Sequence, residues 1–350
     1  MCRAWRRATP HFSTFGNDKQ KTIEVMNTFG HNFRISLFGE SHGKAVGVVI
    51  DGTPAGIALS EGDFEADLAR RRAGAVGTTA RTESDIPEIL SGVYRGHTTG
   101  APIAILFRNE NTRSEDYEPL RETPRPSHAD WTANVKFDGW NDPRGGGHFS
   151  GRLTLALVAA GTVAKKILGE GVKVGAEVCE IGGEKDSAKW LELLERTQSD
   201  GDSVGGIVEC HAEGIPAGLG EPFFDSLEST ISHLLFSIPG VRGVEFGDGF
   251  GAAKMRGSEH NDAIVGLDGK TAKNGAGGIN GGISNGNPLS LRVAVKPTSS
   301  IARPQQTLNT TTGEMCTLTI GGRHDVCIAL RAAVIVESAV AIALADAMLR

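Results

Sequence analysis

The C-terminal segment 326–349 places the strongest constraint on what this chain can fold into. It consists mostly of Ala, Val, Ile and Leu, and Glu337 and Asp346 are its only acidic residues. This composition predicts a helix that is apolar on more than two faces. Such a helix must be buried nearly all round, so we expect it in a helical layer between sheets or at a subunit contact. Asp325 precedes the segment and is the expected N-cap.

Short apolar runs bounded by turn residues predict strands in the rest of the chain. They lie at 35–38, 46–50, 88–96, 102–107, 172–178, 206–211, 243–246 and 289–295. Apolar residues at helical spacing predict further helices at 63–72, 153–168, 188–196 and 224–235. The polar segment 109–141 has no clear period, and we expect a functional loop there because long irregular loops in compact domains often carry function.

The composition argues against several kinds of partner. The formal net charge of −6 disfavours a nucleic-acid-binding surface. No run approaches the ~20 apolar residues that a membrane span requires. The five cysteines form no CxxC pair, so neither a metal site nor a disulfide framework is predicted, and a reducing, cytoplasmic location is expected.

The N-terminal residues 1–25 differ from the rest, because they are basic and contain no acid before Asp18. They read either as a transit peptide or as an over-extended start upstream of Met26. We therefore expect an N-terminal extension followed by a single domain over 26–350. The glycine-rich stretch 266–286 is a candidate boundary between two similar halves of that domain.

Three of the ten histidines lie in polar, turn-forming sequences. His42 lies in Phe-Gly-Glu-Ser-His-Gly, His128 in Arg-Pro-Ser-His-Ala-Asp, and His324 directly precedes Asp325. A titratable group in such a loop remains accessible to a ligand. Each motif alone is also compatible with a turn in which the side chains only cap the backbone.

Three further segments carry features of anion binding. Gly145–Gly147 precedes a predicted helix, and free backbone N–H groups at a helix N-terminus bind anions. The run 296–300, Lys-Pro-Thr-Ser-Ser, offers an ammonium group and hydroxyls, although alone it is an ordinary strand-exit turn. Arg70–Arg72 ends another predicted helix. These cations are also compatible with an ordinary solvated helix end, because positive charge is favoured at a helix C-terminus.

Taken together, these segments resemble the chorismate synthase family. The match begins near Met26 and continues to the C-terminus. It is carried by 38–43, 70–72, 125–130, 144–152, 243–245, 277–286, 296–300 and 323–327, together with Glu337. Several independent motifs in the order of the family are far more specific than any one of them.

The resemblance implies an α+β fold in which antiparallel sheets enclose a helical layer, and a homotetramer. It implies a lyase of the shikimate pathway, which leads to the aromatic amino acids. The reaction is an anti-1,4-elimination of phosphate and a proton from 5-enolpyruvylshikimate 3-phosphate, giving chorismate. Reduced FMN is required without net redox change; some members reduce it with NADPH and others depend on a separate flavin reductase.

The resemblance also implies catalytic roles. His42 would protonate the leaving phosphate, and His128 would donate a proton to the reduced flavin. Asp325, supported by Ser41, would assist deprotonation near the flavin N5. These roles suit a reaction in which a departing phosphate needs charge neutralisation and an allylic C–H bond needs a base.

Binding residues follow from the same matches. The substrate contacts are Arg71, Arg125 and Arg152, and Arg71 also matches a position assigned to NADP. The FMN contacts correspond to His148, Phe149, Ser150, Pro239, Gly240, Gly281, Lys296, Pro297, Thr298, Ser299, Ser300 and Arg323.

Two departures from the family pattern stand out. Where the family commonly has Arg-Ser-Ser-Ala-Arg, this chain has His148-Phe149-Ser150-Gly151-Arg152, so a cation becomes a titratable ring and we expect a weaker or pH-dependent FMN contact. An arginine that the family often carries near Gly77 is missing, which leaves a second NADP contact unsupported.

Two other functions remain open at this stage. A non-catalytic flavin- or phosphometabolite-binding protein of the same fold is disfavoured because His42, His128 and Asp325 are all present. A metal-free phosphatase acting through His42 predicts phosphate release without any reduced flavin. The catalytic interpretation requires these three side chains to open onto one shared cavity.

Overall fold

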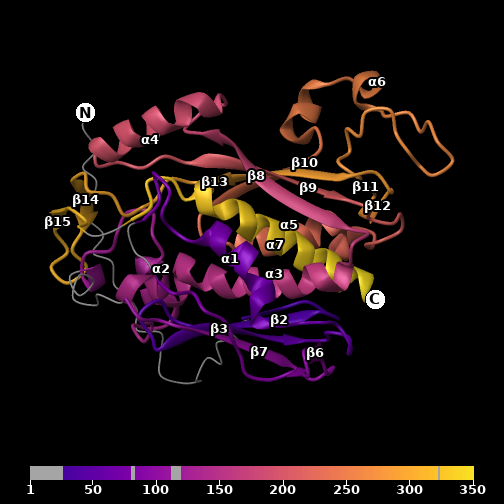
Figure 1. Ribbon diagram of the computed structural model, residues 1–350. Helices are drawn as coiled ribbons and strands as arrows, with labels where there is room; N and C mark the ends of the chain where they lie inside the picture. The colour runs from indigo at the N-terminus through magenta and orange to yellow at the C-terminus, as the bar shows by residue number, and fades with distance from the viewer. Residues whose placement is uncertain (1–26, 80–82, 112–119, 322–323) are drawn as a thin grey trace, which may run out of the picture.

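Two antiparallel sheets enclose a layer of helices (Figure 1). The computed structural model describes residues 27–79, 83–111, 120–321 and 324–350. The expected N-terminal extension lies outside these residues. The arrangement is the expected α+β sandwich, while the division into one domain or two similar halves stays a prediction.

The first sheet has the strand order β1-β2-β3-β7-β4. Its strands are β1 (Thr28–Phe29), β2 (Arg34–Gly39), β3 (Ala45–Asp51), β7 (Ile103–Arg108) and β4 (Glu88–Ile89). Alternate residues of β7, namely Ile103, Ile105 and Phe107, are fully buried. This alternation directs one face of the sheet towards the helical layer.

The second sheet has the order β10-β13-β9-β8, and all its neighbouring strands are antiparallel. Its strands are β8 (Lys173–Ile181), β9 (Gly206–Glu213), β10 (Val241–Phe246) and β13 (Leu289–Val295). Three two-stranded pairs complete the strands: β5 (Val93–Tyr94) with β6 (His97–Thr98), β11 (Ile279–Asn280) with β12 (Ile283–Ser284), and β14 (Gln305–Leu308) with β15 (Met315–Leu318).

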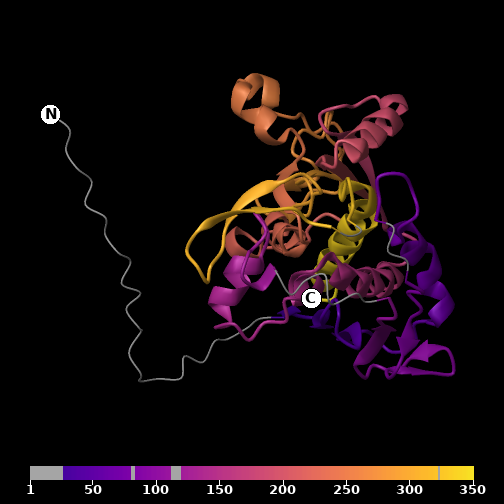
Figure 2. The ribbon, with the colours of Figure 1, turned by 90° about the vertical axis from the view of Figure 1, so that its left-hand side faces the viewer.

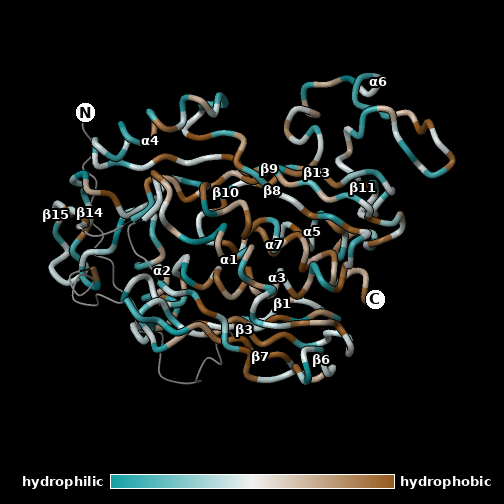
Figure 3. Tube along the Cα trace, viewed as in Figure 1, coloured by the Kyte–Doolittle hydropathy of each residue, from teal (hydrophilic) through white to brown (hydrophobic). Residues whose placement is uncertain are grey.

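The helices between the sheets supply most of the shared core. They are α1 (Glu65–Arg71), α3 (Thr154–Leu168), α5 (Leu227–Ser237) and α7 (Ala329–Met348). The others are α2 (Asp130–Lys136), α4 (Trp190–Ser199) and α6 (Gly257–His260). Figure 3 shows the hydrophobic segments concentrated in the central layer and on the strands that face it, as burial of apolar surface requires.

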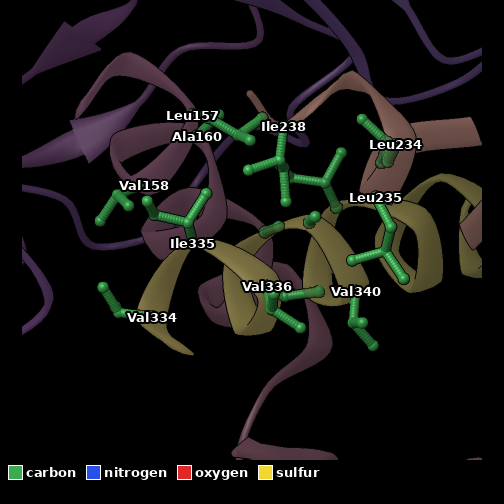
Figure 4. Packing of buried hydrophobic residues seen from close by; sticks show 14 of the residues in the cluster. Leu157, Val158, Ala160, Leu234, Leu235, Ile238, Val334, Ile335, Val336 and Val340 are labelled. Atoms are coloured by element: carbon green, nitrogen blue, oxygen red, sulfur yellow. The ribbon is translucent and has the colours of Figure 1, made fainter. Parts of the chain in front are cut away.

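The apolar C-terminal helix is confirmed as a buried element. In α7 nearly every side chain from Val334 to Ala345 is buried, and Figure 4 shows it packed against α3 and α5. No helix of the described residues is long and apolar enough to cross a membrane.

The predicted N-cap of this helix is wrong. Helix α7 begins at Ala329 with Ile328 at the N-cap position. The backbone N–H groups of Val326 and Cys327 donate to the carbonyl of Gly77 at 2.9 and 3.1 Å. This connection ties the chain down before the helix begins, so the carboxylate of Asp325 is available for other contacts.

The two acidic residues of α7 are compensated inside the protein. Arg70 donates two hydrogen bonds to Glu337, at 2.9 and 2.8 Å, and Lys165 forms a second ion pair with it. The backbone N–H of Ala176 also donates to Glu337. Asp346 accepts hydrogen bonds from successive backbone N–H groups just before β2. A buried carboxylate is tolerated when its oxygens are paired in this way.

Other differences from the predicted elements have local causes. The loop expected over 109–141 contains the short helix α2, and the strand expected over 88–96 divides into β4 and β5. Gly92, with φ +81°, turns the chain between those strands. Figure 2 shows the β14–β15 hairpin beside the segment that precedes α2. Thr307 donates to the carbonyl of Pro124 at 2.7 Å, so the hairpin helps to position the loop around His128.

The contact between α3 and α7 yields a stability prediction. Alanine is normally favoured over glycine within a helix by about 1 kcal/mol. At Gly161, however, an added Cβ would lie 2.7 Å from the Cα of Ser338 on α7. We expect Gly161→Ala to destabilise the fold by about 1–3 kcal/mol through overpacking and to lower the Tm measured by thermal unfolding.

Gly257→Ala is the control for this substitution, because no atom lies within 4 Å of the added Cβ in α6. It should change the Tm little. A Gly161→Ala protein with the stability of the wild type would contradict the close approach of the two helices.

Candidate active site

A cavity of about 910 Å³ lies beside the N-terminal ends of α3 and α7 and the C-terminal end of α5. Its volume is in the range of small-molecule sites, about 300–1,000 Å³. The helix dipoles of α3 and α7 both present their positive ends here, which favours an anionic ligand. Apolar side chains, including Leu37, Leu157 and Ile238, form part of the wall.

Most of the predicted site residues line this cavity. They are Ser41, Arg125, His128, His148, Phe149, Ser150, Arg152, Pro239, Gly240, Lys296, Thr298, Ser299, Ser300 and Asp325. Chain segments far apart in the sequence therefore converge at one place, which the sequence interpretation required.

Other predicted residues do not line it. Among the described residues, His42, Arg71, Gly281 and Pro297 are not part of the cavity wall. Gly281 lies in the turn between β11 and β12, and Pro297 packs towards Gly205 at the end of the second sheet. Arg323 lies outside the described residues. All three catalytic side chains were expected to open onto the cavity. His128 and Asp325 do so, whereas His42 does not line it.

His42 lies behind a glycine of the cavity wall. An added Cβ at Gly145 would lie 2.6 Å from Cδ2 and 2.7 Å from Nε2 of His42, and 2.8 Å from the hydroxyl of Ser41. An added Cβ at the next residue, Gly146, would lie 3.6 Å from Nε2 of His128. The absence of side chains at these two positions lets both histidines approach the same loop.

The triple glycine does not lead directly into α3 as expected, and an anion site at this helix end stays a prediction. Gly145, Gly146 and Gly147 all have positive φ, and a second 3-10 turn, Gly151–Leu153, separates them from α3. The carbonyl of Gly147 accepts the backbone N–H of Ser41 at 3.0 Å. The triple glycine therefore joins the two histidine-containing loops.

Arg125, His128 and Asp130 form a hydrogen-bonded group. Arg125 donates from Nε and Nη2 to the two carboxylate oxygens of Asp130, at 2.8 and 2.7 Å. His128 Nδ1 lies 2.6 Å from Oδ1 of the same carboxylate. Burial lowers the pKa of His128, an effect that the hydrogen bond with Asp130 opposes.

The predicted run 296–300 is fastened to this group. Arg125 Nη1 donates to the hydroxyl of Ser300 at 3.0 Å, and Lys296 Nζ donates to the hydroxyl of Ser299 at 2.8 Å. Ser299 in turn donates to the carbonyl of Ser127 at 3.0 Å. Burial lowers the pKa of Lys296, assisted by the nearby charge of Arg242, which also lines the cavity.

Two predicted substrate arginines share a buried carboxylate. Asp85, 4% exposed, pairs with Arg152 and lies 3.7 Å from Arg71. Arg71 also donates to the hydroxyl of Thr154 at 3.1 Å and to the carbonyl of Gly151 at 2.9 Å. Burial lowers the pKa of Arg71 to about 9, so it remains a cation at neutral pH. Arg71 therefore fastens α1 to the start of α3, whereas Arg152 reaches the cavity.

Asp325 is held by two different elements. It accepts the backbone N–H of Thr79 at 2.9 Å and lies 3.1 Å from Nη1 of Arg331. Arg331, on α7, also donates from Nε to the carbonyl of Arg71 at 2.9 Å. This network connects α1, α7 and the cavity wall.

His148 occupies the position where the family commonly has arginine. Its Nδ1 lies 2.8 Å from the carbonyl of Gly39 and its Nε2 lies 3.2 Å from Oδ1 of Asn27. The ring therefore binds the backbone end of β2 while lining the cavity. Whether it weakens FMN binding stays a prediction.

Sequence reasoning missed Asp85, Asp130 and Arg331 as members of the site. Asp130 belongs to the same motif as His128, and its spacing of two residues was the available signal. Asp85 and Arg331 become recognisable only when the fold brings them to their partners.

We expect Asp85→Asn to destabilise the protein strongly. The substitution keeps the size of the side chain but leaves Arg71 and Arg152 without their shared buried countercharge. Breaking a buried ion pair in this way costs about 3–5 kcal/mol, and thermal unfolding should show a large decrease in Tm. Asp51→Asn, which alters the exposed pair with Arg34, is the matched control and should lower the Tm only slightly, because solvent screens exposed ion pairs. Equal Tm changes in the two variants would contradict a structural role for Asp85.

Comparison with known proteins agrees with the sequence motifs and the fold. The family model described as chorismate synthase matches residues 33–349. The chorismate synthase of Chitinophaga pinensis is 62% identical over 324 residues, covering 93% of this chain and 97% of that protein. The chorismate synthase of Korarchaeum cryptofilum is 48% identical, covering 92% and 97%.

A solved structure gives the same result. A crystal structure of chorismate synthase aligns with a TM-score of 0.69 at 29% identity, covering 92% of this chain and 93% of that one. Sequence, fold and relatives thus agree over nearly the whole described length, and this chain belongs to the chorismate synthase family.

Proposed function

We propose that this protein is a lyase that converts 5-enolpyruvylshikimate 3-phosphate to chorismate. The C–O bond to phosphate and one C–H bond break, a new C=C bond forms, and no net oxidation occurs. The observation that carries the proposal is the convergence of His128, Asp325 and Ser41 on one cavity that also contains the cations Arg125 and Arg152. Family membership supplies the reaction for which these groups suit the chemistry.

The residues of the cavity fit a bound FMN. Lys296 and Arg242 provide cations, Thr298 and Ser299 provide hydroxyls, and apolar side chains such as Leu37 suit the faces of a flat ring. Reduced FMN, when bound, supplies an electron-rich ring that assists loss of phosphate and removal of the proton. The volume of the cavity leaves room for a second, smaller ligand beside it.

We assign proton transfer to the two histidines. His42 protonates the departing phosphate, a role that its position directly behind Gly145 of the cavity wall supports. His128 donates a proton to the reduced flavin. Burial lowers the pKa of His128, which makes its imidazolium a stronger proton donor.

Asp325 assists removal of the substrate proton. Its carboxylate is held by Thr79 and Arg331 and faces the same cavity as His128. Arg125 and Arg152 bind the anionic groups of the substrate. Each is already paired with a carboxylate, so each contributes oriented N–H groups more than uncompensated charge.

We extend three further properties of the family to this chain. It works as a homotetramer, it resides in the cytoplasm, and either NADPH or a separate reductase supplies the reduced flavin. The neighbouring rings of Phe223 and Phe224, which are 84% and 92% exposed, support a subunit contact.

An anaerobic assay tests the proposed reaction. With reduced FMN and 5-enolpyruvylshikimate 3-phosphate, the protein is expected to release phosphate and form chorismate in equal amounts. His42→Ala and His128→Ala should each lower the rate by on the order of a hundredfold, because each removes a proton-transfer group. His211→Ala, on the exposed side of β9, is the control.

Three outcomes separate the alternatives. Phosphate release without reduced flavin would favour a phosphatase, and binding without turnover would favour a silent binding protein. Unchanged rates in both histidine variants would reject their assigned roles. A parallel reaction with NADPH and oxidised FMN, without a partner reductase, determines whether this chain reduces its own flavin.

The glycine contact at His42 predicts a second effect on the rate. Gly145→Ala places a methyl group against His42 and Ser41, so we expect a loss comparable to that of His42→Ala. Gly139→Ala also introduces a side chain at positive φ, +78°. Its added Cβ lies 3.6 Å from the nearest atom, Oδ1 of Asn134, so this variant should retain most activity. Equal losses in the two variants, measured as kcat under the same anaerobic conditions, would assign the effect to backbone strain.

A further inference from the structure

Asp130 is the first residue of α2 and lies directly behind His128. Of the described residues that line the cavity of about 910 Å³, His128 is one and Asp130 is not. The carboxylate is largely buried, with a side-chain exposure of 11%. Its place suits a group that acts on the cavity through the imidazole.

The contacts at His128 Nδ1 determine which ring nitrogen carries the proton. Nδ1 lies 2.6 Å from Oδ1 of Asp130 and 3.0 Å from Nη2 of Arg125. A carboxylate can only accept and a guanidinium can only donate, so Nδ1 cannot satisfy both. A bare Nδ1 at 2.6 Å from a carboxylate oxygen would bring two lone pairs together. Nδ1 therefore carries a proton and donates it to Asp130.

Arg125 fixes the carboxylate in this orientation. Its Nη2 donates to Oδ1 at 2.7 Å, and its Nε and backbone N–H donate to Oδ2 at 2.8 and 3.0 Å. Arg125 and His128 thus converge on Oδ1 as two donors, which explains their own separation of 3.0 Å. Although burial acts in the opposite direction, these hydrogen bonds hold the pKa of Asp130 well below its usual range, so it stays an acceptor.

The opposite edge of the ring is then the one that exchanges protons. Gly146 lies beside it, with an added Cβ 3.5 Å from Cε1 and 3.6 Å from Nε2. We propose that Asp130, clamped by Arg125, is a positioning residue that keeps the proton on Nδ1 of His128 and so reserves Nε2 as the atom that gains and loses a proton in the cavity. This inference rests on the proposed function of His128.

The proposal gives Arg125 a second role. Its guanidinium contributes to the cavity wall and at the same time orients the carboxylate that orients the histidine. A carboxylate behind a histidine is a recurring device for fixing its tautomer. Here the device is built within one six-residue motif, Arg-Pro-Ser-His-Ala-Asp.

Nitrogen NMR of the whole protein with ¹⁵N-labelled histidine tests the proposal without turnover. The His128 signals, identified by their loss in His128→Gln, should show a protonated Nδ1 and a bare Nε2 in the neutral wild type. In Asp130→Asn the amide can donate to Nδ1, so the proton should move to Nε2. Asp51→Asn, an arginine-paired carboxylate at the end of β3, should leave the signals unchanged.

Rates provide the second measurement. Asp130→Asn should lower kcat by a factor no larger than that of His128→Ala, on the order of a hundredfold. In a His128→Ala background the same substitution should cost almost nothing further, since Asp130 acts through the imidazole.

The outcomes keep this inference separate from the proposed function. A wild-type His128 protonated on Nε2, or an unchanged Nδ1 proton in Asp130→Asn, would overturn the positioning role even if the enzyme is active. An undiminished loss in the His128→Ala background would overturn it as well. If His128→Ala alone has no effect on the rate, the proposed role of His128 fails, while the NMR result still decides the role of Asp130. The wild-type spectrum decides the tautomer even if Asp130→Asn fails to fold.

Discussion

The burial of α7 on all sides is the constraint on which the rest of the structure depends. A helix whose side chains from Val334 to Ala345 are almost all removed from water needs a cover above and below, and the two sheets provide it. The close approach of α3 at Gly161 then sets these two helices side by side. Their N-terminal ends reach the same cavity, so packing in the core determines where the positive ends of the two helix dipoles lie.

Charges inside this fold are arranged as local pairs. Glu337 is neutralised by Arg70 and Lys165 within the helical layer, and Asp85 is shared by Arg71 and Arg152 beside the cavity. These pairs add little net stability compared with apolar packing, because desolvation offsets most of the attraction. Their effect is to fix geometry, since each arginine or carboxylate that takes part has few alternative positions.

The fold could be predicted from the sequence wherever the composition of one segment was enough to predict that the segment is buried. The apolar segment ending at Leu349 could only be enclosed, and most strands of both sheets followed from their apolar runs, although β1 was not predicted. The start of α7 could not be predicted, because the carbonyl of Gly77 binds the backbone N–H groups of Val326 and Cys327 from a distant part of the chain. The same limit applies to the site: motifs named the loops, but the position of His42 behind Gly145 depends on tertiary contacts.

Because of these tertiary contacts, the arginines of the motifs have different roles in the fold from those that the sequence suggests. From sequence, Arg71, Arg125 and Arg152 look equivalent, as three cations for one anionic substrate. In the fold, Arg71 is withdrawn to bind the start of α3, and Arg152 is held by Asp85. Arg125 forms an ion pair with Asp130 and also lines the cavity. Much of the attraction for an anion must therefore come from Lys296, Arg242 and the two helix dipoles, and the paired arginines serve mainly to hold donors and histidines in fixed directions.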